Sequence, residues 1–136
     1  PMHQMLLGGL AAVALLGCSA PHPPNQFNLV CDGTTEGQTF PKPSKFVQPL
    51  HNVYVVDLDH RIWCDAACAN GPSPIYGFDE LSIVLSNSGN VDNPLKVAID
   101  RSSGELDSFM AVGALSLHGK GKCLKAAFTG LPEHKF

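Results

Sequence analysis

The chain has 136 residues, a net charge of −3 with neutral histidines, and only 15% charged residues. A chain of this length corresponds to one domain. The charge excludes the basic surface typical of nucleic-acid-binding proteins and the polybasic patches that attract anionic membranes. We therefore expect a single small domain with no nucleic-acid partner.

The N-terminal segment is apolar. Residues 6–17 carry no charged side chain. This run is too short for a membrane span of about 20 residues, and its length is typical of the hydrophobic part of a signal peptide. It ends in Leu15, Leu16, Gly17 and Cys18, which resembles the lipobox of bacterial lipoproteins. The resemblance implies cleavage before Cys18 and lipid on its thiol, so we predict a signal peptide over residues 1–17.

Two other interpretations of this segment stay open. One is an ordinary secretory signal cut at Ala20, which would leave a free protein, and the other is a buried apolar helix of the domain itself. Residues 1–5 contain neither Lys nor Arg, although a signal peptide normally starts with them. We therefore expect that the natural chain either continues upstream of Pro1 or begins at Met2.

Residues 18–26 are expected to form a spacer. Three prolines, Pro21, Pro23 and Pro24, favour an extended and semi-rigid chain. Acyl chains contribute about 0.8 kcal/mol of membrane affinity per buried methylene. Lipid on Cys18 therefore predicts anchoring at a membrane of the bacterial cell envelope, at the outer membrane or facing the periplasm, with a soluble secreted or periplasmic protein as the alternative.

The remaining chain, residues 27–136, has the pattern of an all-β domain. Strand-like segments recur about every 8–12 residues with turn residues between them, and no long stretch has helical periodicity. This pattern predicts a single antiparallel meander shaped like a barrel or a sandwich. The expected strands cover residues 27–31, 53–58, 61–64, 75–78, 81–85, 95–100, 105–112, 115–124 and 126–128.

Several segments between these strands are predicted to be turns or irregular chain. Residues 32–37 contain two glycines, and residues 40–50 contain three prolines, which a central strand does not tolerate. In residues 53–58, Tyr54, Val56 and Leu58 fall on one face. We expect that face in the core, together with Trp63, the single tryptophan.

Five cysteines are present, and if Cys18 carries lipid, four cysteines remain to form disulfides. An even number in a small exported domain indicates two disulfides. Three pairings are possible for Cys31, Cys64, Cys68 and Cys123. We favour Cys31–Cys123, which would join the first strand to the last, and Cys64–Cys68, which would close one turn. The alternative is a zinc or copper site made by Cys64, Cys68 and His60, but no second Cys or His pair has matching spacing.

The remaining polar residues give no strong sign of catalysis, metal binding or a cofactor. Acid–base or calcium chemistry would need carboxylates such as Asp57, Asp59, Asp65 and Glu80 to converge, and no calcium-loop motif is present. The histidines at positions 51, 60, 118 and 134 have no site-like spacing and are expected at the surface. Residues 119–122 lack the phosphate-loop pattern, so we interpret them as a β segment.

The body resembles a family of small exported alphaproteobacterial proteins, some of them lipoproteins, for which no activity is established. The resemblance covers most of residues 27–136 and supports the fold and export rather than a mechanism. It depends on motifs at residues 27–31, 56–59, 61–64 with Cys68, 99–101 with Gly104, 121–123, 128–132 and 135–136.

The sequence therefore predicts an envelope lipoprotein with a non-enzymatic binding or structural role. A second hypothesis is a lysozyme-inhibitor-like periplasmic binding module, although the C-terminal motif of those inhibitors is missing. A third is a small enzyme in which Asp57, His60 and Glu80 converge in a pocket.

Overall fold

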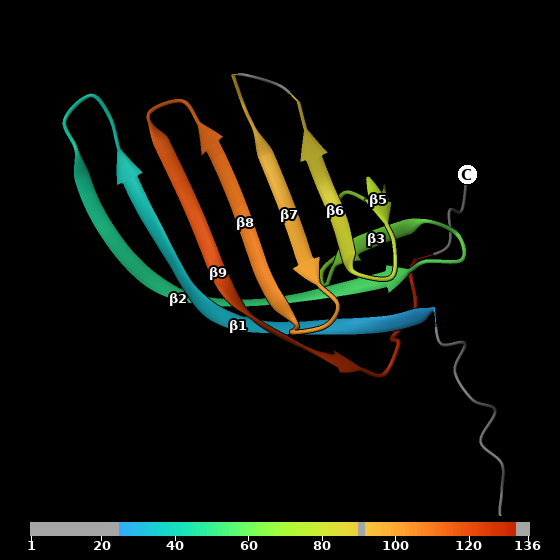
Figure 1. The fold of residues 1–136 in the computed structure, drawn as a ribbon. Helices are drawn as coiled ribbons and strands as arrows, with labels where there is room; N and C mark the ends of the chain where they lie inside the picture. The colour runs from blue at the N-terminus through green and yellow to red at the C-terminus, as the bar shows by residue number, and fades with distance from the viewer. Residues whose placement is uncertain (1–24, 90–91, 133–136) are drawn as a thin grey trace, which may run out of the picture.

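The computed structural model describes residues 25–89 and 92–132, and this part of the chain is built from strands. All the strands pair antiparallel in one sheet that curls into a half-barrel (Figure 1). The all-β prediction is confirmed. Within the described residues no helix is long and apolar enough to cross a membrane.

The sheet has the strand order β4-β3-β2-β1-β9-β8-β7-β6-β5. The first and last strands of the chain therefore lie side by side at the centre of the sheet. The strand bounds are β1 (Gln26–Thr39), β2 (Ser44–Asp57), β3 (Ile62–Asp65), β4 (Ser73–Pro74), β5 (Gly77–Phe78), β6 (Ser82–Ser88), β7 (Leu95–Asp100), β8 (Glu105–Val112) and β9 (Leu115–Ala126).

The β1–β2 hairpin is much longer than the sequence indicates. Residues 32–37 were predicted as a turn, and that prediction is wrong, because β1 continues through them and pairs with β2 on one side and β9 on the other. Residues 44–50, predicted as irregular or edge chain, form the first half of β2. Pro49 is tolerated there because this half of β2 has a neighbouring strand on one side only.

Two opposed glycines let the centre of the sheet bend sharply. Gly33 of β1 pairs with Gly121 of β9 on the concave face. A Cβ atom on Gly33 would overlap the Lys120 carbonyl, and one on Gly121 would come within 2.5 Å of the Asp32 carbonyl oxygen. The backbones of β1 and β9 therefore approach more closely than side chains would allow, and both strands curve at this level (Figure 1).

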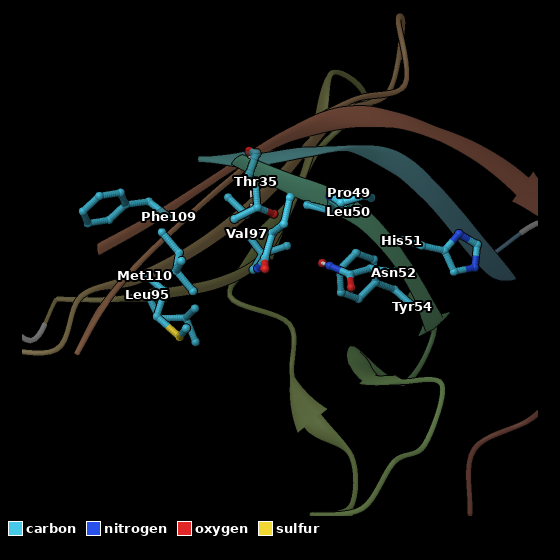
Figure 2. A pocket seen from close by; sticks show the side chains of 14 residues that line it. Thr35, Pro49, Leu50, His51, Asn52, Tyr54, Leu95, Val97, Phe109 and Met110 are labelled. Carbon is cyan, nitrogen blue, oxygen red and sulfur yellow. Dashed lines mark hydrogen bonds between the residues drawn. The ribbon is translucent and has the colours of Figure 1, made fainter. Parts of the chain in front are cut away.

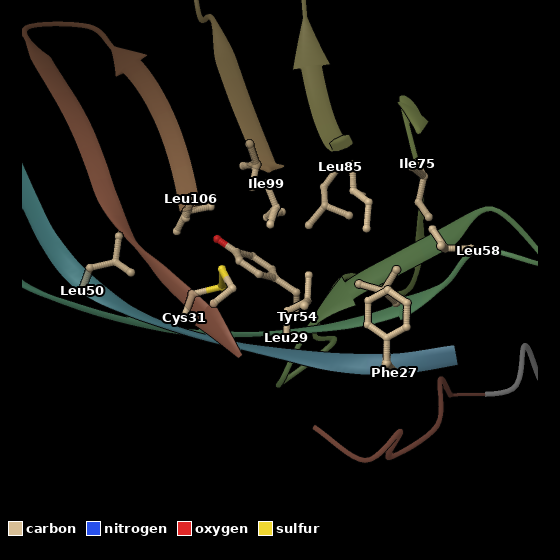
Figure 3. Packing of buried hydrophobic residues seen from close by; sticks show 14 residues of the cluster. Phe27, Leu29, Cys31, Leu50, Tyr54, Leu58, Ile75, Leu85, Ile99 and Leu106 are labelled. Atoms are coloured by element: carbon tan, nitrogen blue, oxygen red, sulfur yellow. A yellow bond between two sulfur atoms is a disulfide. The ribbon is translucent and has the colours of Figure 1, made fainter. Parts of the chain in front are cut away.

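The hydrophobic core fills the lower part of the concave face (Figure 3). Tyr54, Val56 and Leu58 all lie in it, as predicted, and Trp63 packs against it as a half-buried residue. The strictly alternating burial of β7 places Val97 and Ile99 inward. The other buried members come from most of the remaining strands and their connections: Phe27, Leu29, Cys31, Leu50, Ile75, Ile83, Leu85, Leu106 and Cys123.

One short segment, residues 73–78, joins the two ends of the sheet at the bottom of the half-barrel. It supplies both β4, which pairs with β3, and β5, which pairs with β6. The Ile75 N–H donates to the Arg61 carbonyl at 2.9 Å, and the Tyr76 N–H donates to the Leu85 carbonyl at 3.2 Å. The sheet is thus closed at this level and open above it.

Both favoured disulfides are present. Cys31 and Cys123 are directly opposed on β1 and β9 with Cα atoms 3.9 Å apart, and they close a loop with a sequence separation of 92. Cys64 and Cys68, separated by 4 positions with Cα atoms 5.2 Å apart, close the turn after β3. The metal alternative is wrong, because both thiols of its proposed ligand set are used in the second disulfide.

The two disulfides should differ in their effect on stability. The chain-entropy estimate is about 4–5 kcal/mol for the long loop and about 2 kcal/mol for the short one. We expect the double variant Cys31→Ala/Cys123→Ala to lose roughly twice as much unfolding free energy in urea as Cys64→Ala/Cys68→Ala. Equal losses in the two variants would contradict the central role of the β1–β9 crosslink.

Candidate functional site

The upper part of the concave face holds a groove with a volume of about 340 Å³ (Figure 2). It lies above the hydrophobic core, where the half-barrel is open. Its floor comes from the inward-facing residues of β7, β8 and β9, which alternate along each strand: Leu95, Val97, Ser108, Met110, Leu117 and Gly119. If the domain binds a ligand, this concave surface is the candidate site.

The wall formed by β2 differs from the floor. Residues 48–52 line the groove consecutively, so that both the inward-facing and the outward-facing positions contribute. Side chains of a strand alternate between its two faces, so an unbroken run indicates that the strand edge itself bounds the groove. The edge is open because β3 pairs only with residues 54–57 of β2.

The described lining contains no Asp, Glu, Lys or Arg. The polar groups are the His51 imidazole and the hydroxyls and amides of Thr35, Gln48, Asn52, Tyr54 and Ser108. Because an isolated charge is costly to bring into a surface without counter-charges, this lining favours an uncharged ligand that is partly apolar.

Three of these hydroxyl and amide side chains are already engaged, and two are available. Asn52 donates from Nδ2 to the Tyr54 hydroxyl at 3.0 Å, and Ser108 donates to the Gly119 carbonyl at 3.5 Å. Among the described residues, the side chains of Gln48 and Thr35 make no hydrogen bond to each other or to a neighbour within the groove. They can therefore bond a ligand without breaking an existing contact.

Tyr54 connects the groove to the core. Burial raises the pKa of its hydroxyl, the hydrogen bond from Asn52 opposes that shift, and the Asp65 carboxylate adds to it. The phenol therefore stays neutral at physiological pH. Its ring packs edge-on against Trp63, with centroids 5.8 Å apart. The indole Nε1 of Trp63 is buried and has no hydrogen-bond partner among the described residues.

Asp57 and His60, two members of the predicted acid–base set, do meet, but at the turn between β2 and β3. The His60 ring Nδ1 lies 2.7 Å from Asp57 Oδ2, and the His60 backbone N–H donates to Asp57 Oδ1 at 3.0 Å. The Gln26 amide also donates to Oδ2 at 2.9 Å. Asp57 is 4% exposed. These bonds hold the turn and the start of β1 together.

The remaining carboxylates of that set have separate local roles. Asp59 accepts from the Asn25 amide at 2.8 Å, and Asp65 accepts from the Cys68 backbone N–H at 2.8 Å. Glu80 is exposed in the turn between β5 and β6. The described residues contain no cluster of three or more His, Cys, Asp or Glu side chains suited to a metal ion.

The described histidines lie at the surface, as predicted, but each one pairs with an aspartate. His51 lies 2.5 Å from Asp32, across the β1–β2 pair, and His118 lies 2.7 Å from Asp107, across the β8–β9 pair. The sequence analysis missed these pairs because only the register of the strands brings their members together. His134 lies outside the described residues.

Three further predictions concern residues that the structure describes only in part or not at all. Cys18, the proposed lipid-bearing residue, and the whole of the signal segment at residues 1–17 are not described. Of the predicted spacer, residues 25 and 26 are described, and β1 begins at Gln26.

Comparison of the chain with protein-family models, with curated proteins and with solved structures finds no match. The family resemblance noted in the sequence therefore remains a prediction. The site must be interpreted from its own geometry.

The Asp57 contacts predict a pH dependence of stability. Burial alone would raise the pKa of Asp57, but the hydrogen bonds from His60 and Gln26 outweigh it and hold the pKa below its usual value. A lowered pKa stabilises the folded state above about pH 4, and this stabilisation disappears as the pH falls towards the folded-state pKa.

We therefore expect Asp57→Asn to lose about 1–3 kcal/mol of unfolding free energy at pH 7, measured in urea, and less at pH 3. The exposed neighbour provides the control, since Asp59→Asn should stay within about 0.5 kcal/mol of the parent at both pH values. A loss for Asp57→Asn that is as large at pH 3 as at pH 7 would argue against a carboxylate kept ionised by the turn.

Proposed function

We propose that this chain is a lipid-anchored protein of the bacterial cell envelope that binds a ligand in its concave groove and does not catalyse a reaction. The observation that carries the binding role is the groove itself: an open hollow of about 340 Å³ above a well-packed core, lined by no Asp, Glu, Lys or Arg among the described residues. Apolar floor residues with a few hydroxyl and amide groups are typical of ligand sites in proteins.

The chemistry of the groove supports binding rather than catalysis. A general acid or base must lie within hydrogen-bond reach of the reacting group. Asp57 and His60 hold the β2–β3 turn and do not line the groove. His51, the one imidazole in the described lining, is exposed on β2 and is paired with Asp32, which does not line the groove. Tyr54, which does line it, has a raised pKa and stays protonated.

The location is supported by the cysteines. Two disulfides in a small domain favour an oxidising compartment, such as the periplasm or the cell exterior. The lipobox-like motif before Cys18 adds the membrane anchor, and residues 18–25 would link that anchor to the start of β1. At about 3.1 Å per residue, this spacer would let the domain stand roughly 25 Å from the lipid surface.

A pair of neighbouring substitutions tests the groove. Thr35 lines it from β1, whereas Thr34 is exposed on the opposite face of the same strand. We expect Thr35→Tyr to weaken binding by at least about tenfold, because the added ring occupies the groove, and Thr34→Tyr to leave binding unchanged. Trp63 stays the single tryptophan in both variants and reports ligand contact through Tyr54.

The measurement is equilibrium binding of the purified domain to separated envelope fractions: peptidoglycan fragments, extracted lipids in vesicles, and solubilised envelope proteins. The bound component should be recovered chemically unchanged, as judged by its mass. Binding that survives Thr35→Tyr would place the site elsewhere on the molecule, and conversion of the ligand would show an enzyme.

The anchor is tested separately by expressing the complete coding sequence in a bacterium. The parent chain should fractionate with membranes, and the intact mass of the mature protein should show lipid on Cys18. Cys18→Ala should abolish the lipid and release the domain from the membrane or leave it unprocessed, whereas the neighbouring control Ser19→Ala should behave as the parent. A parent chain cut at Ala20 and recovered in the soluble fraction would contradict the lipoprotein assignment.

A further inference from the structure

The open edge of β2 beside the groove is the feature that goes furthest beyond a general binding role. β2 pairs with β1 along its whole length, but β3 covers only residues 54–57 of its other side. β3 ends at Asp65, where the Cys64–Cys68 disulfide and the hydrogen bond from Cys68 N–H to Asp65 turn the chain away. Residues 44–53 therefore have backbone groups that no described strand pairs.

Pro49 shows which of these backbone groups face the opening. In an antiparallel pair, alternate residues exchange hydrogen bonds with the neighbouring strand. Pro49 has no N–H, so its position fits the set that points away from β1. Val47, His51 and Val53 have the same parity as Pro49. Leu58, which has the opposite parity, donates its N–H to the Asn25 carbonyl on the β1 side at 2.8 Å. Val47, His51 and Val53 thus offer N–H and C=O groups to the opening, and Pro49 offers a carbonyl.

The groove lies directly against this edge. Residues 48–52 of β2 line it without a gap, and Figure 2 shows Pro49, Leu50, His51 and Asn52 along one side with Leu95 and Met110 across from them. A chain lying in the groove would therefore meet the edge groups of β2 with its backbone and the apolar floor with alternate side chains.

We propose that the groove binds an extended, uncharged polypeptide segment of another protein, which adds a strand to the open edge of β2. This inference rests on the binding role proposed above and specifies its ligand. The added strand would lie end to end with β3 and extend the cover of β2 towards its tip. Its inward side chains would be apolar and would contact Leu50, Met110 and Leu117, while Gln48 and Thr35 would bond its polar groups.

The same edge disfavours a second copy of this chain as the occupant. Symmetric pairing of two β2 edges would place two Pro49 residues in one ladder and remove two hydrogen bonds, whereas a foreign strand meets only one. Pro49 also limits indiscriminate pairing, because edge prolines are a common protection against aggregation.

Random peptides displayed on phage serve as the probe, selected against the full mature domain with both disulfides formed. Selected peptides are then synthesised with a single N-methyl group at each position in turn, and their binding is followed by Trp63 fluorescence and by calorimetry. We expect N-methylation to weaken binding about tenfold at every second residue and to have little effect at the residues between, because a strand presents alternate N–H groups to one edge.

Substitution in β2 provides the complementary test. Val47→Pro removes one edge-facing N–H at an exposed position, and Val47→Thr keeps it. The proline variant should bind the peptides about tenfold more weakly, and the threonine variant should match the parent. Circular dichroism and the emission spectrum of Trp63 should show that both variants are folded.

The outcomes separate this inference from the binding role itself. Peptides that bind without the alternating N-methyl pattern overturn strand addition, and so does an equal effect of both Val47 substitutions. If no peptide is selected, but a neutral glycan or lipid binds and Thr35→Tyr weakens that binding, strand addition is overturned and the binding role of the groove is retained. Self-association of the parent that Val47→Pro abolishes assigns the edge to a second copy instead. If neither assay finds a ligand whose binding depends on the groove, both proposals are overturned.

Discussion

The structure depends on the pairing of β1 with β9 at the centre of the sheet. This pairing joins the two ends of the domain along residues 28–39 and 115–126, and the Cys31–Cys123 disulfide fixes its register on the concave face. Two residues further along, Gly33 and Gly121 lie opposite each other and allow the backbones to approach closely. The covalent link and the bend together give the sheet its curvature, and the curvature creates both the core and the groove.

The half-barrel divides its concave face into two regions with different roles. In the lower region, residues 73–78 join both ends of the sheet, and large apolar side chains fill the interior. In the upper region the strands have no closing partner, and polar side chains join the apolar ones in the interior lining. A closed base thus supplies stability and leaves the upper part of β2 with an unpaired edge. The proposed ligand site exists because the barrel does not close there.

Asp, Glu, Lys and Arg side chains are absent from the described lining of this groove, although His51 is part of its β2 wall. His51, His60 and His118 each pair with an aspartate at the surface or at a turn, and Lys120 and Lys122 face outward from β9 on either side of the inward Gly121. Asp57 is the buried exception, and its three donors hold the β2–β3 turn. The polarity of the two faces therefore follows the alternation of the strands, which directs lysines and carboxylates to water and keeps them out of the groove lining.

The sequence by itself determined the all-β class, the presence of two disulfides, and the strands at residues 95–100 and 105–112, because these depend on cysteine parity and on local period-two patterns. It favoured the disulfide pairing that forms, but the structure decided among the three possible pairings. It failed for residues 32–37, where glycines that are typical of a turn continue β1 because strands from distant parts of the chain pair with both sides. It also gave no sign of the groove. Thr35, Gln48 and Asn52 are ordinary polar residues in the sequence, and only the curl of the sheet brings them opposite β7 and β8. The open edge of β2 likewise results from where β3 ends, so only the tertiary structure decides it.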